Sequence, residues 1–262
     1  MFELVNKSAI VLGGAGGIGK EICVQLVNRG LKKLAIIDVV EEALCKDLFK
    51  NLDSYTYKQC SVTDEPKLRE YMTSLKSSMG GLDLVVNSAG ILDEQSPKRT
   101  IDINYGGVVN STLIGIELMR KDRPGNKGGV IVNISSISAL GGHFWLPIYA
   151  GTKHAVLGFT RSLVVSFNNK KFFEKTGVSF MAICPGVTET PLAVVDAFCG
   201  RHQFQDMKDE VKRILDSFPS QGVECVGKCV LEALDDGENG STWQCENNRI
   251  EKLKIIDYPK FA

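Results

Sequence analysis

Tyr149 and Lys153 are the residues in this chain whose types and spacing most directly suggest chemistry. On a helix, residues four apart share one face, so the lysine ammonium can lie beside the tyrosine phenol. A free phenol has a pKa of about 10, which is too high for a base near neutral pH, and a neighbouring positive charge lowers that pKa. The pair therefore predicts acid–base catalysis, while an exposed helix face would explain the spacing equally well if it stood alone.

The segment from Lys7 to Asn28 predicts a site for a phosphate-bearing cofactor. An apolar run, 7–12, is followed at once by Gly-Gly-Ala-Gly-Gly-Ile-Gly and then by apolar residues at helical spacing, which predicts strand, glycine turn and helix. Glycines allow the backbone to turn tightly and to approach a pyrophosphate, which the N–H groups at the helix N-terminus can bind. A glycine turn with no ligand is the alternative. The turn residues concerned are Gly13, Gly17, Ile18 and Gly19.

Asp38 ends the next apolar run, 34–38, and lies 19 residues after Gly19. A carboxylate at this place in a dinucleotide-binding fold accepts hydrogen bonds from the ribose hydroxyls of the adenosine. It would repel a 2′-phosphate, and neither Val39 nor Val40 supplies an arginine to offset that repulsion. These residues predict NAD rather than NADP as the cofactor. The alternative is that Asp38 only caps a helix that starts near Glu41.

Strands and helices are expected to alternate along the rest of the chain. The pattern predicts strands at 55–62, 82–86, 130–134, 178–183 and 241–245, helices at 65–79, 100–119, 149–167 and 223–234, and a tail at 250–262. Such alternation predicts an α/β fold with a single doubly wound parallel sheet of about seven strands and helices on both faces. We expect one Rossmann-type domain over residues 1–262, with its motifs at the carboxyl ends of strands, where open α/β sheets bind ligands.

The segments next to Tyr149 predict an apolar substrate pocket. Residues 143–146, His-Phe-Trp-Leu, lie between Ser136 and Tyr149, where a substrate must pass, and His143 and Leu146 are the candidate contacts. Residues 191–218 follow a cofactor strand and carry apolar clusters at roughly helical spacing, which predicts a helical substrate lid. A helical excursion packed on the core is the alternative.

A net charge of zero and 44% hydrophobic residues are typical of a soluble globular protein. This balance gives no electrostatic reason to expect nucleic acid or an anionic membrane as a partner. The acidic start of the chain and its short apolar runs predict neither a secretory signal nor a membrane span, so we expect a cytoplasmic protein. The 8 scattered cysteines predict reduced, buried thiols and no metal site.

Taken together, these motifs resemble those of the classical short-chain dehydrogenase/reductase family over essentially the full chain. Within that family, the sequence is most similar to NAD-dependent 15-hydroxyprostaglandin dehydrogenases and insect-type alcohol dehydrogenases. The resemblance rests on the order and spacing of the motifs, which are Gly13-x-x-x-Gly17-Ile18-Gly19, Asp38, Asn87-x-Ala89-Gly90, Asn104, Ser136 placed 13 residues before Tyr149, Lys153, and Pro185-Gly186 with Thr190.

The resemblance implies a role for each motif. Tyr149 would take the proton of a substrate hydroxyl and Ser136 would hold its oxygen, while Lys153 would lower the pKa of the phenol and bind the nicotinamide ribose. Asn104 would hold a water on a proton path from Lys153 to solvent. Cofactor contacts would also come from Val39, Ser61, Val62, Asn87, Ala89, Gly90, Pro185, Gly186, Thr188 and Thr190. A homodimer or homotetramer formed through helices 100–119 and 149–167 is a further expectation.

The sequence departs from the family pattern at several positions. Leu12 replaces a threonine before the glycine turn, Ser61 an aspartate near the adenine, Ser88 the second asparagine of the Asn-Asn-Ala-Gly motif, and Thr188 a branched apolar residue, so we expect cofactor affinity to be altered rather than lost. Leu146 stands where the prostaglandin enzymes have a substrate-contacting glutamine, which removes a polar anchor. We therefore expect a hydrophobic secondary alcohol or its ketone as substrate, whether fatty, prostanoid, terpenoid or steroid-like.

Two other functions remain open at this stage. The first is a cofactor-binding scaffold or carrier with little turnover, because a fold does not fix a function. The presence of Ser136, Tyr149, Lys153 and Asn104 together argues against it. The second is an NADPH-dependent ketoreductase, against which Asp38 argues.

Overall fold

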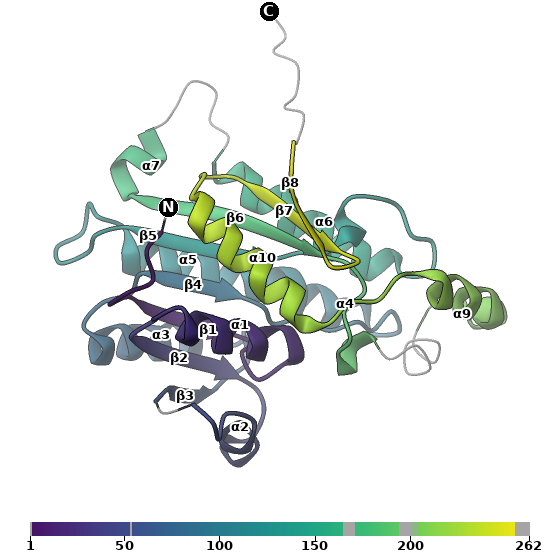
Figure 1. Cartoon of the computed structure of the whole chain (residues 1–262), viewed down its shortest axis with the longest axis horizontal. Coiled ribbons are helices and arrows are strands. Elements are labelled where there is room, and N and C mark those ends of the chain that lie inside the picture. The colour runs from purple at the N-terminus through teal and green to yellow at the C-terminus, as the bar shows by residue number, and fades with distance from the viewer. Residues whose placement is uncertain (1, 53, 165–170, 194–201, 203, 255–262) are drawn as a thin grey trace, which may run out of the picture.

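A computed structural model describes residues 2–52, 54–164, 171–193, 202 and 204–254 of the chain. Within these residues the core is an 8-stranded sheet in the order β3-β2-β1-β4-β5-β6-β7-β8 (Figure 1). The strands are β1 Ser8–Leu12, β2 Lys33–Asp38, β3 Thr56–Gln59, β4 Leu84–Asn87, β5 Gly129–Ile134, β6 Val178–Pro185, β7 Thr242–Glu246 and β8 Arg249–Leu253. All neighbouring pairs up to β7 are parallel. The predicted α/β fold class is confirmed.

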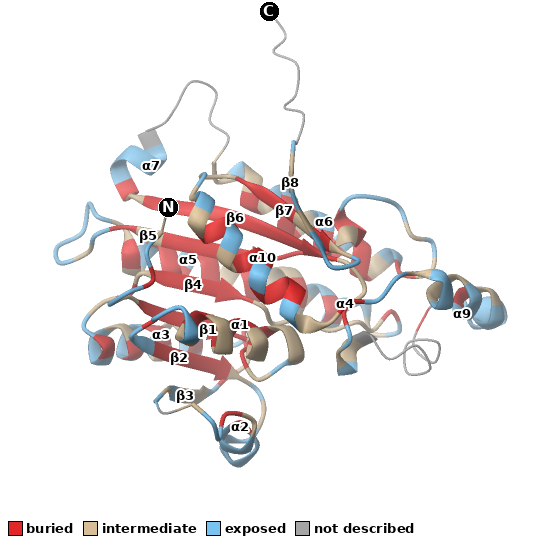
Figure 2. Ribbon diagram, viewed as in Figure 1, coloured by how far each residue is buried: buried red, intermediate tan, exposed pale blue. Residues whose placement is uncertain are grey.

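Helices cover both faces of this sheet. In Figure 1, α1 and α10 lie in front of it, and α3, α5 and α6 lie behind. The helices are α1 Gly17–Asn28, α2 Glu42–Leu48, α3 Glu65–Met79, α4 Pro97–Ile101, α5 Gly107–Met119, α6 Pro147–Ser162, α7 Lys171–Thr176, α9 Lys208–Ser217 and α10 Val223–Asp236. The central strands read as continuous apolar runs because both of their faces are buried (Figure 2). Val11 packs on the α1 and α10 side, and its neighbour Ile10 on the α3 and α5 side.

The predicted tail from Ile250 is wrong in its first residues, because 249–253 form the antiparallel edge strand β8. Asn247 and Asn248 join it to β7 with φ angles of 50° and 58°. A two-residue hairpin turn of type I′ requires positive φ at both central residues, and asparagine tolerates that conformation better than most residues. The two asparagines were therefore the local signal for this eighth strand.

The helix predicted at 100–119 is interrupted. It consists of α4, a π-helical turn at Asp102–Gly106, and α5. A π turn inserts a residue into the helical ladder and is frequent at functional sites. Asn104 lies within this π turn and not, as the predicted helix implied, in the interior of a regular α-helix.

The predicted lid at 191–218 is helical where the structure describes it. It contains short 3-10 turns at Pro191–Ala193 and Gln205–Met207, followed by α9, and residues 194–201 and 203 lie outside the described residues. In Figures 1 and 2, α9 projects from the body beyond the carboxyl ends of the strands and is largely exposed. This placement puts it beside the functional edge of the sheet.

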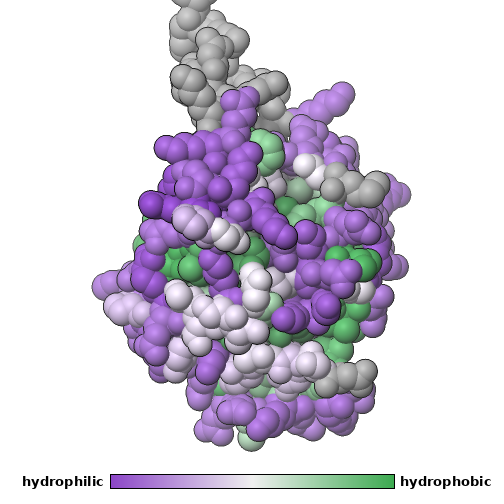
Figure 3. Space-filling model, turned by 90° about the vertical axis from the view of Figure 1, so that its left-hand side faces the viewer, coloured by the Kyte–Doolittle hydropathy of each residue, from purple (hydrophilic) through white to green (hydrophobic). Residues whose placement is uncertain are grey.

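Apolar side chains are also exposed away from this edge, among them Leu113 and Phe173. Figure 3 shows mostly hydrophilic side chains, with apolar patches between them, on the face that lies at the left of Figure 1. On the two helices expected to form a subunit interface, Val108 and Val156 are buried within the chain and Leu113 is exposed. No described helix combines the length and the apolar character that a membrane crossing needs. Every cysteine in the described ranges is buried and free of disulfides.

Candidate active site

Helix α6 carries Tyr149 and Lys153 on one buried face. Pro147 is its first residue, a position that suits proline because the missing N–H would have no partner within the helix. Lys153 Nζ lies 5.5 Å from the centroid of the Tyr149 ring and donates to the backbone oxygen of Ile134 at 3.1 Å. The Ser135 hydroxyl donates to the backbone oxygen of Lys153 at 2.9 Å. Both bonds tie α6 to the carboxyl end of β5.

Ser136 follows directly in the first turn after β5, beside the Tyr149 ring. Its Oγ accepts the backbone N–H of Ser138 at 3.1 Å, which fixes the hydroxyl at the start of a short 3-10 turn. Burial raises the pKa of Tyr149 to about 12, although a hydrogen bond with Ser136 acts in the opposite direction. Burial also lowers the pKa of Lys153 to about 8. In the protein alone, desolvation therefore outweighs the lowering of the phenol pKa that the ammonium was expected to produce.

Asn104 is fully buried and its amide group is engaged on both sides. Its Oδ1 accepts the N–H of Ile91 at 2.8 Å, and its Nδ2 donates to the oxygen of the same residue at 2.9 Å and to Thr152 Oγ1 at 3.2 Å. A Cβ added to Gly90 would lie 3.3 Å from Asn104 Oδ1 and 3.6 Å from Lys153 Nζ. Asn104 thus fixes the loop after β4 close to Lys153.

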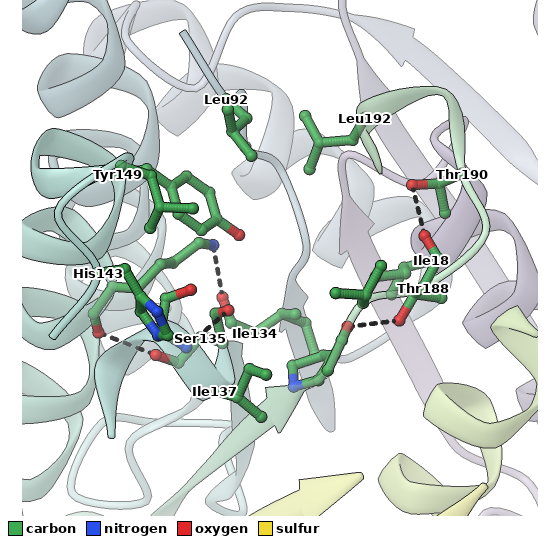
Figure 4. A pocket seen from close by; sticks show the side chains of 18 of the residues that line it. Ile18, Leu92, Ile134, Ser135, Ile137, His143, Tyr149, Thr188, Thr190 and Leu192 are labelled. Atoms are coloured by element: carbon green, nitrogen blue, oxygen red, sulfur yellow. Dashed lines mark hydrogen bonds between the residues drawn. The ribbon is translucent and has the colours of Figure 1, made fainter. Parts of the chain in front are cut away.

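Ser136, Tyr149 and Lys153 line one cavity at the carboxyl edge of the sheet. Figure 4 shows Tyr149 and His143 on one side of it and Thr188 and Thr190 on the other, with the Tyr149 hydroxyl directed into the space between. All four predicted substrate residues, Ser136, His143, Leu146 and Tyr149, line this cavity. The rest is largely apolar, with contributions from Ile18, Leu92, Ile134, Ile137, Trp145, Pro185, Val187, Leu192, Leu215 and Phe218.

A second cleft adjoins this cavity and shares Ser88 and Gly90 with it. It is lined by seven of the predicted cofactor residues: Gly13, Asp38, Val39, Ser61, Val62, Ala89 and Gly90. Ile18, Pro185, Gly186, Thr188 and Thr190 line the first cavity instead. Asn87 is a lining residue of neither cavity. Its Nδ2 donates to Asn133 Oδ1 at 2.7 Å and to Thr112 Oγ1 at 3.0 Å in the core.

The glycine turn suits a dinucleotide because Gly13, Gly17 and Gly19 leave no room for a side chain at their positions. Gly13 has a φ of +71°, and a Cβ on it would lie 2.5 Å from the backbone of Ala89. A Cβ on Gly19 would lie 2.1 Å from the oxygen of Gly13, and one on Gly17 would lie 2.7 Å from the side chain of Thr190. The backbone therefore forms the floor of the cleft, and the N-terminus of α1 opens there without a side-chain cap.

Asp38 joins the end of β2 to this turn. Its Oδ2 accepts the backbone N–H of Ala15 at 2.9 Å, and its Oδ1 accepts that of Val39 at 2.7 Å. The N-cap of α2 is Glu41, so Asp38 does not serve as the helix cap considered above. Asp38 Oδ1 also accepts the N–H of Val40 at 3.4 Å. An ionised carboxylate has about four acceptor sites, so about one remains for a ribose hydroxyl.

Three buried residues of the site were not identified from the sequence. Ser135 and Thr152 act through backbone bonds that only the fold brings together. Glu94 accepts two N–H groups from the first turn of α6, and its position in the sequence carried no spacing signal. His143, which was predicted, meets Trp145 in an edge-on contact with ring centroids 5.0 Å apart, and burial lowers its pKa.

This combination of fold and site is that of a short-chain dehydrogenase. Residues 7–196 match the short chain dehydrogenase family, so the chain belongs to that family of oxidoreductases. It is 30% identical to Alcohol dehydrogenase 1 of Ceratitis capitata and 29% identical to Alcohol dehydrogenase 1 of Ceratitis cosyra, in each case over 259 residues that cover 98% of both chains. These insect relatives confirm the resemblance to insect alcohol dehydrogenases.

Solved structures show the same fold at lower identity. Levodione reductase superposes with a TM-score of 0.76 at 23% identity, covering 93% of this chain and 97% of that one. A short-chain type dehydrogenase/reductase from Mycobacterium ulcerans gives a TM-score of 0.74 at 22% identity, covering 94% of this chain and 90% of that one. At this identity the two structures establish the architecture.

Proposed function

We propose that the protein is an NAD-dependent oxidoreductase that interconverts a hydrophobic secondary alcohol and its ketone, with Tyr149 as the general base. The observation that carries this proposal is the convergence of Ser136, Tyr149 and Lys153 on one cavity beside a glycine-floored cleft. The insect relatives are named alcohol dehydrogenases, which supports an alcohol as the substrate class.

The residues of the cavity divide the chemistry between them. Bound NAD would accept the hydride that leaves the carbinol carbon, and its positive ring would add to the charge of Lys153 near the phenol. As a phenolate, which these two positive charges would favour, Tyr149 takes the hydroxyl proton on Oη and becomes the phenol again, while the C–H electron pair leaves as hydride and the C–O group becomes a carbonyl. The Ser136 hydroxyl donates a hydrogen bond to that oxygen and holds it within reach of Tyr149. Asn104 fixes the loop that contains Gly90, and this loop lies between Lys153 and the cofactor cleft.

NAD is favoured over NADP by the charge at the end of β2. Asp38 is partly buried and lines the cleft, and no arginine stands at 39 or 40 to bind a 2′-phosphate. A phosphate dianion near this carboxylate would be repelled, whereas a ribose diol would be bound.

The substrate wall favours an apolar alcohol, and it contains one polar group that lacks a partner. Leu92, Leu215 and Phe218 supply apolar surface to the cavity that the catalytic residues line. The indole N–H of Trp145 is buried without an acceptor in the part of the chain that the structure describes. An alcohol with a second oxygen on its apolar body would satisfy this donor, since an unpaired buried donor is unfavourable. We place the described part of 191–218 over this wall as the substrate lid.

The test is NADH formation by the purified protein with NAD and a panel of secondary alcohols, in matched pairs with and without a second oxygen. We expect turnover of apolar members, and a loss of roughly 10² to 10⁴-fold in Tyr149→Phe, the range that general acid–base groups contribute. Tight NADH binding with no turnover of any alcohol would instead favour the scaffold or carrier function.

Assembly into a dimer or tetramer is part of the proposal. Leu113 on α5 is 45% exposed and would be covered in an interface through the long helices. Sedimentation of the purified protein as a monomer at micromolar concentration would refute it.

A further inference from the structure

The loop of residues 88–96 connects the cofactor cleft to the catalytic helix. Its first residues, Ser88 and Gly90, line both cavities. Asn104 fixes Ile91 by bonds to both its N–H and its oxygen, and Thr100 Oγ1 donates to the oxygen of Asp93 at 2.6 Å. The loop is therefore held against α4 and the π turn before it reaches Glu94.

Glu94 closes the connection to α6. Its side chain is fully buried, Oε1 accepts the N–H of Tyr149 at 2.7 Å, and Oε2 accepts that of Ile148 at 2.9 Å. These N–H groups belong to the first turn, where no partner exists within the helix. Leu146, the N-cap residue, contributes no side-chain bond. The carboxylate of Glu94 therefore satisfies two donors that would otherwise be unpaired, one of them on the catalytic tyrosine itself.

The cost of burying this carboxylate indicates how firmly it is held. Burial and the neighbouring Asp93 raise the pKa of Glu94, and the hydrogen bonds from Tyr149 and Ile148 act in the opposite direction. A buried charge is tolerated only where hydrogen bonds or partners compensate its lost hydration. The positive end of the α6 dipole adds to that compensation.

We propose that Glu94 is a positioning residue that fixes the backbone of Tyr149 relative to the loop lining the cofactor cleft. Tyr149 must meet a substrate oxygen that Ser136 also holds, so a small displacement of its backbone would separate the phenol from the reacting hydroxyl. Misplacement of a catalytic group by about 1 Å can cost about 10²-fold in rate. Glu94 acts through Tyr149 and takes no part in proton transfer.

A cap that only stabilises the fold would behave differently. It would lower the free energy of unfolding and leave the turnover of the folded fraction unchanged. Asp83 offers a control, because its carboxylate accepts the N–H of Ser8 at 3.0 Å, the Ser8 hydroxyl at 3.1 Å and Lys7 Nζ at 3.3 Å at the opposite edge of the sheet. Glu94→Gln and Asp83→Asn are the same isosteric change at two carboxylates that bind backbone N–H groups.

The experiment measures kcat, KM and the Kd for NADH in wild type, Glu94→Gln, Glu94→Asp and Asp83→Asn. We expect Glu94→Gln to lower kcat about 10 to 100-fold while the Kd for NADH stays within about twofold of wild type. Glu94→Asp keeps the charge on a shorter side chain, so its kcat should lie between those of the wild type and Glu94→Gln. Asp83→Asn should keep the wild-type kcat. An unchanged kcat in Glu94→Gln, or equal losses in Glu94→Gln and Asp83→Asn, would overturn the proposal.

This inference rests on the proposed function, because kcat is its main readout. Amide hydrogen exchange of Ile148 and Tyr149 supplies a second readout that needs no substrate, and we expect faster exchange in Glu94→Gln. An inactive wild type would refute the proposed function. The exchange rates would then decide separately, since unchanged rates would show that Glu94 does not hold the first turn of α6.

Discussion

The two walls of the cavity are held in different ways. On the catalytic wall, Ser136, Tyr149 and Lys153 are each at most 9% exposed, and backbone hydrogen bonds fix the elements that carry them. On the substrate wall, Trp145 contacts His143 and Phe218 through rings whose centroids are 5.0 and 6.1 Å apart. Directional hydrogen bonds hold the catalytic wall, and apolar packing holds the substrate wall.

This difference separates chemistry from selectivity. Hydrogen bonds define a single arrangement of atoms, which proton transfer requires. Apolar contacts are less directional and tolerate changes in shape at modest cost. Substitutions on the catalytic wall should therefore change kcat for every alcohol, and substitutions on the substrate wall should change which alcohol is preferred.

The largest expected effect of the substitutions in this comparison is the loss of Lys153. Lys153→Met keeps much of the side-chain length but removes the charge near Tyr149 and the bond to Ile134. We expect turnover to fall roughly 10² to 10⁴-fold, with circular dichroism as the control for folding. Turnover within tenfold of wild type would show that the ammonium is not required.

Lys153 also predicts a pH dependence of stability. Its pKa is lowered from 10.5 to about 8 on folding, so the folded protein binds fewer protons than the unfolded chain between these values. The free energy of unfolding should therefore rise with pH across this window, by about 3 kcal/mol relative to Lys153→Met. Parallel urea titrations of both proteins from pH 7 to 10 measure the difference, and parallel curves would contradict the burial of a charged lysine.

A smaller effect is expected at the cofactor end. Asp38→Asn removes the charge that repels a 2′-phosphate but keeps an acceptor for the N–H of Ala15. We expect the ratio of the NADPH and NADH dissociation constants to fall about tenfold, measured by fluorescence titration. Tighter binding of NADPH than NADH by the wild type would refute the assignment of NAD and favour the ketoreductase alternative.

How far the sequence predicted these features depended on whether the cause was local. Helix α3 has the predicted bounds because Asp64 caps its start and Gly80, at a φ of 70°, ends it. The catalytic residues of α6 and the glycine turn also follow from short motifs. Their meeting at one edge of the sheet follows from the parallel topology.

The features that the sequence did not predict depend on contacts between distant segments. Glu94 reaches α6 across 54 residues of chain, and Asn87 is drawn into the core by Asn133 from another strand. The π turn around Asn104 has no residue pattern of its own that distinguishes it from an ordinary helix. Residue spacing predicts which residues are neighbours within one helix or strand, so it could not predict these contacts between distant segments.

The most direct test of the account compares kcat/KM for a small and a bulky alcohol, such as propan-2-ol and 2-octanol, in Ser136→Ala and Phe218→Ala. Ser136→Ala should lower both values by a common factor of roughly 10², the usual cost of one hydrogen-bond donor to a reacting oxygen, and leave their ratio within about twofold. Phe218→Ala should change the ratio by about fivefold or more. A ratio that shifts as much in Ser136→Ala as in Phe218→Ala would contradict the separation of chemistry from selectivity.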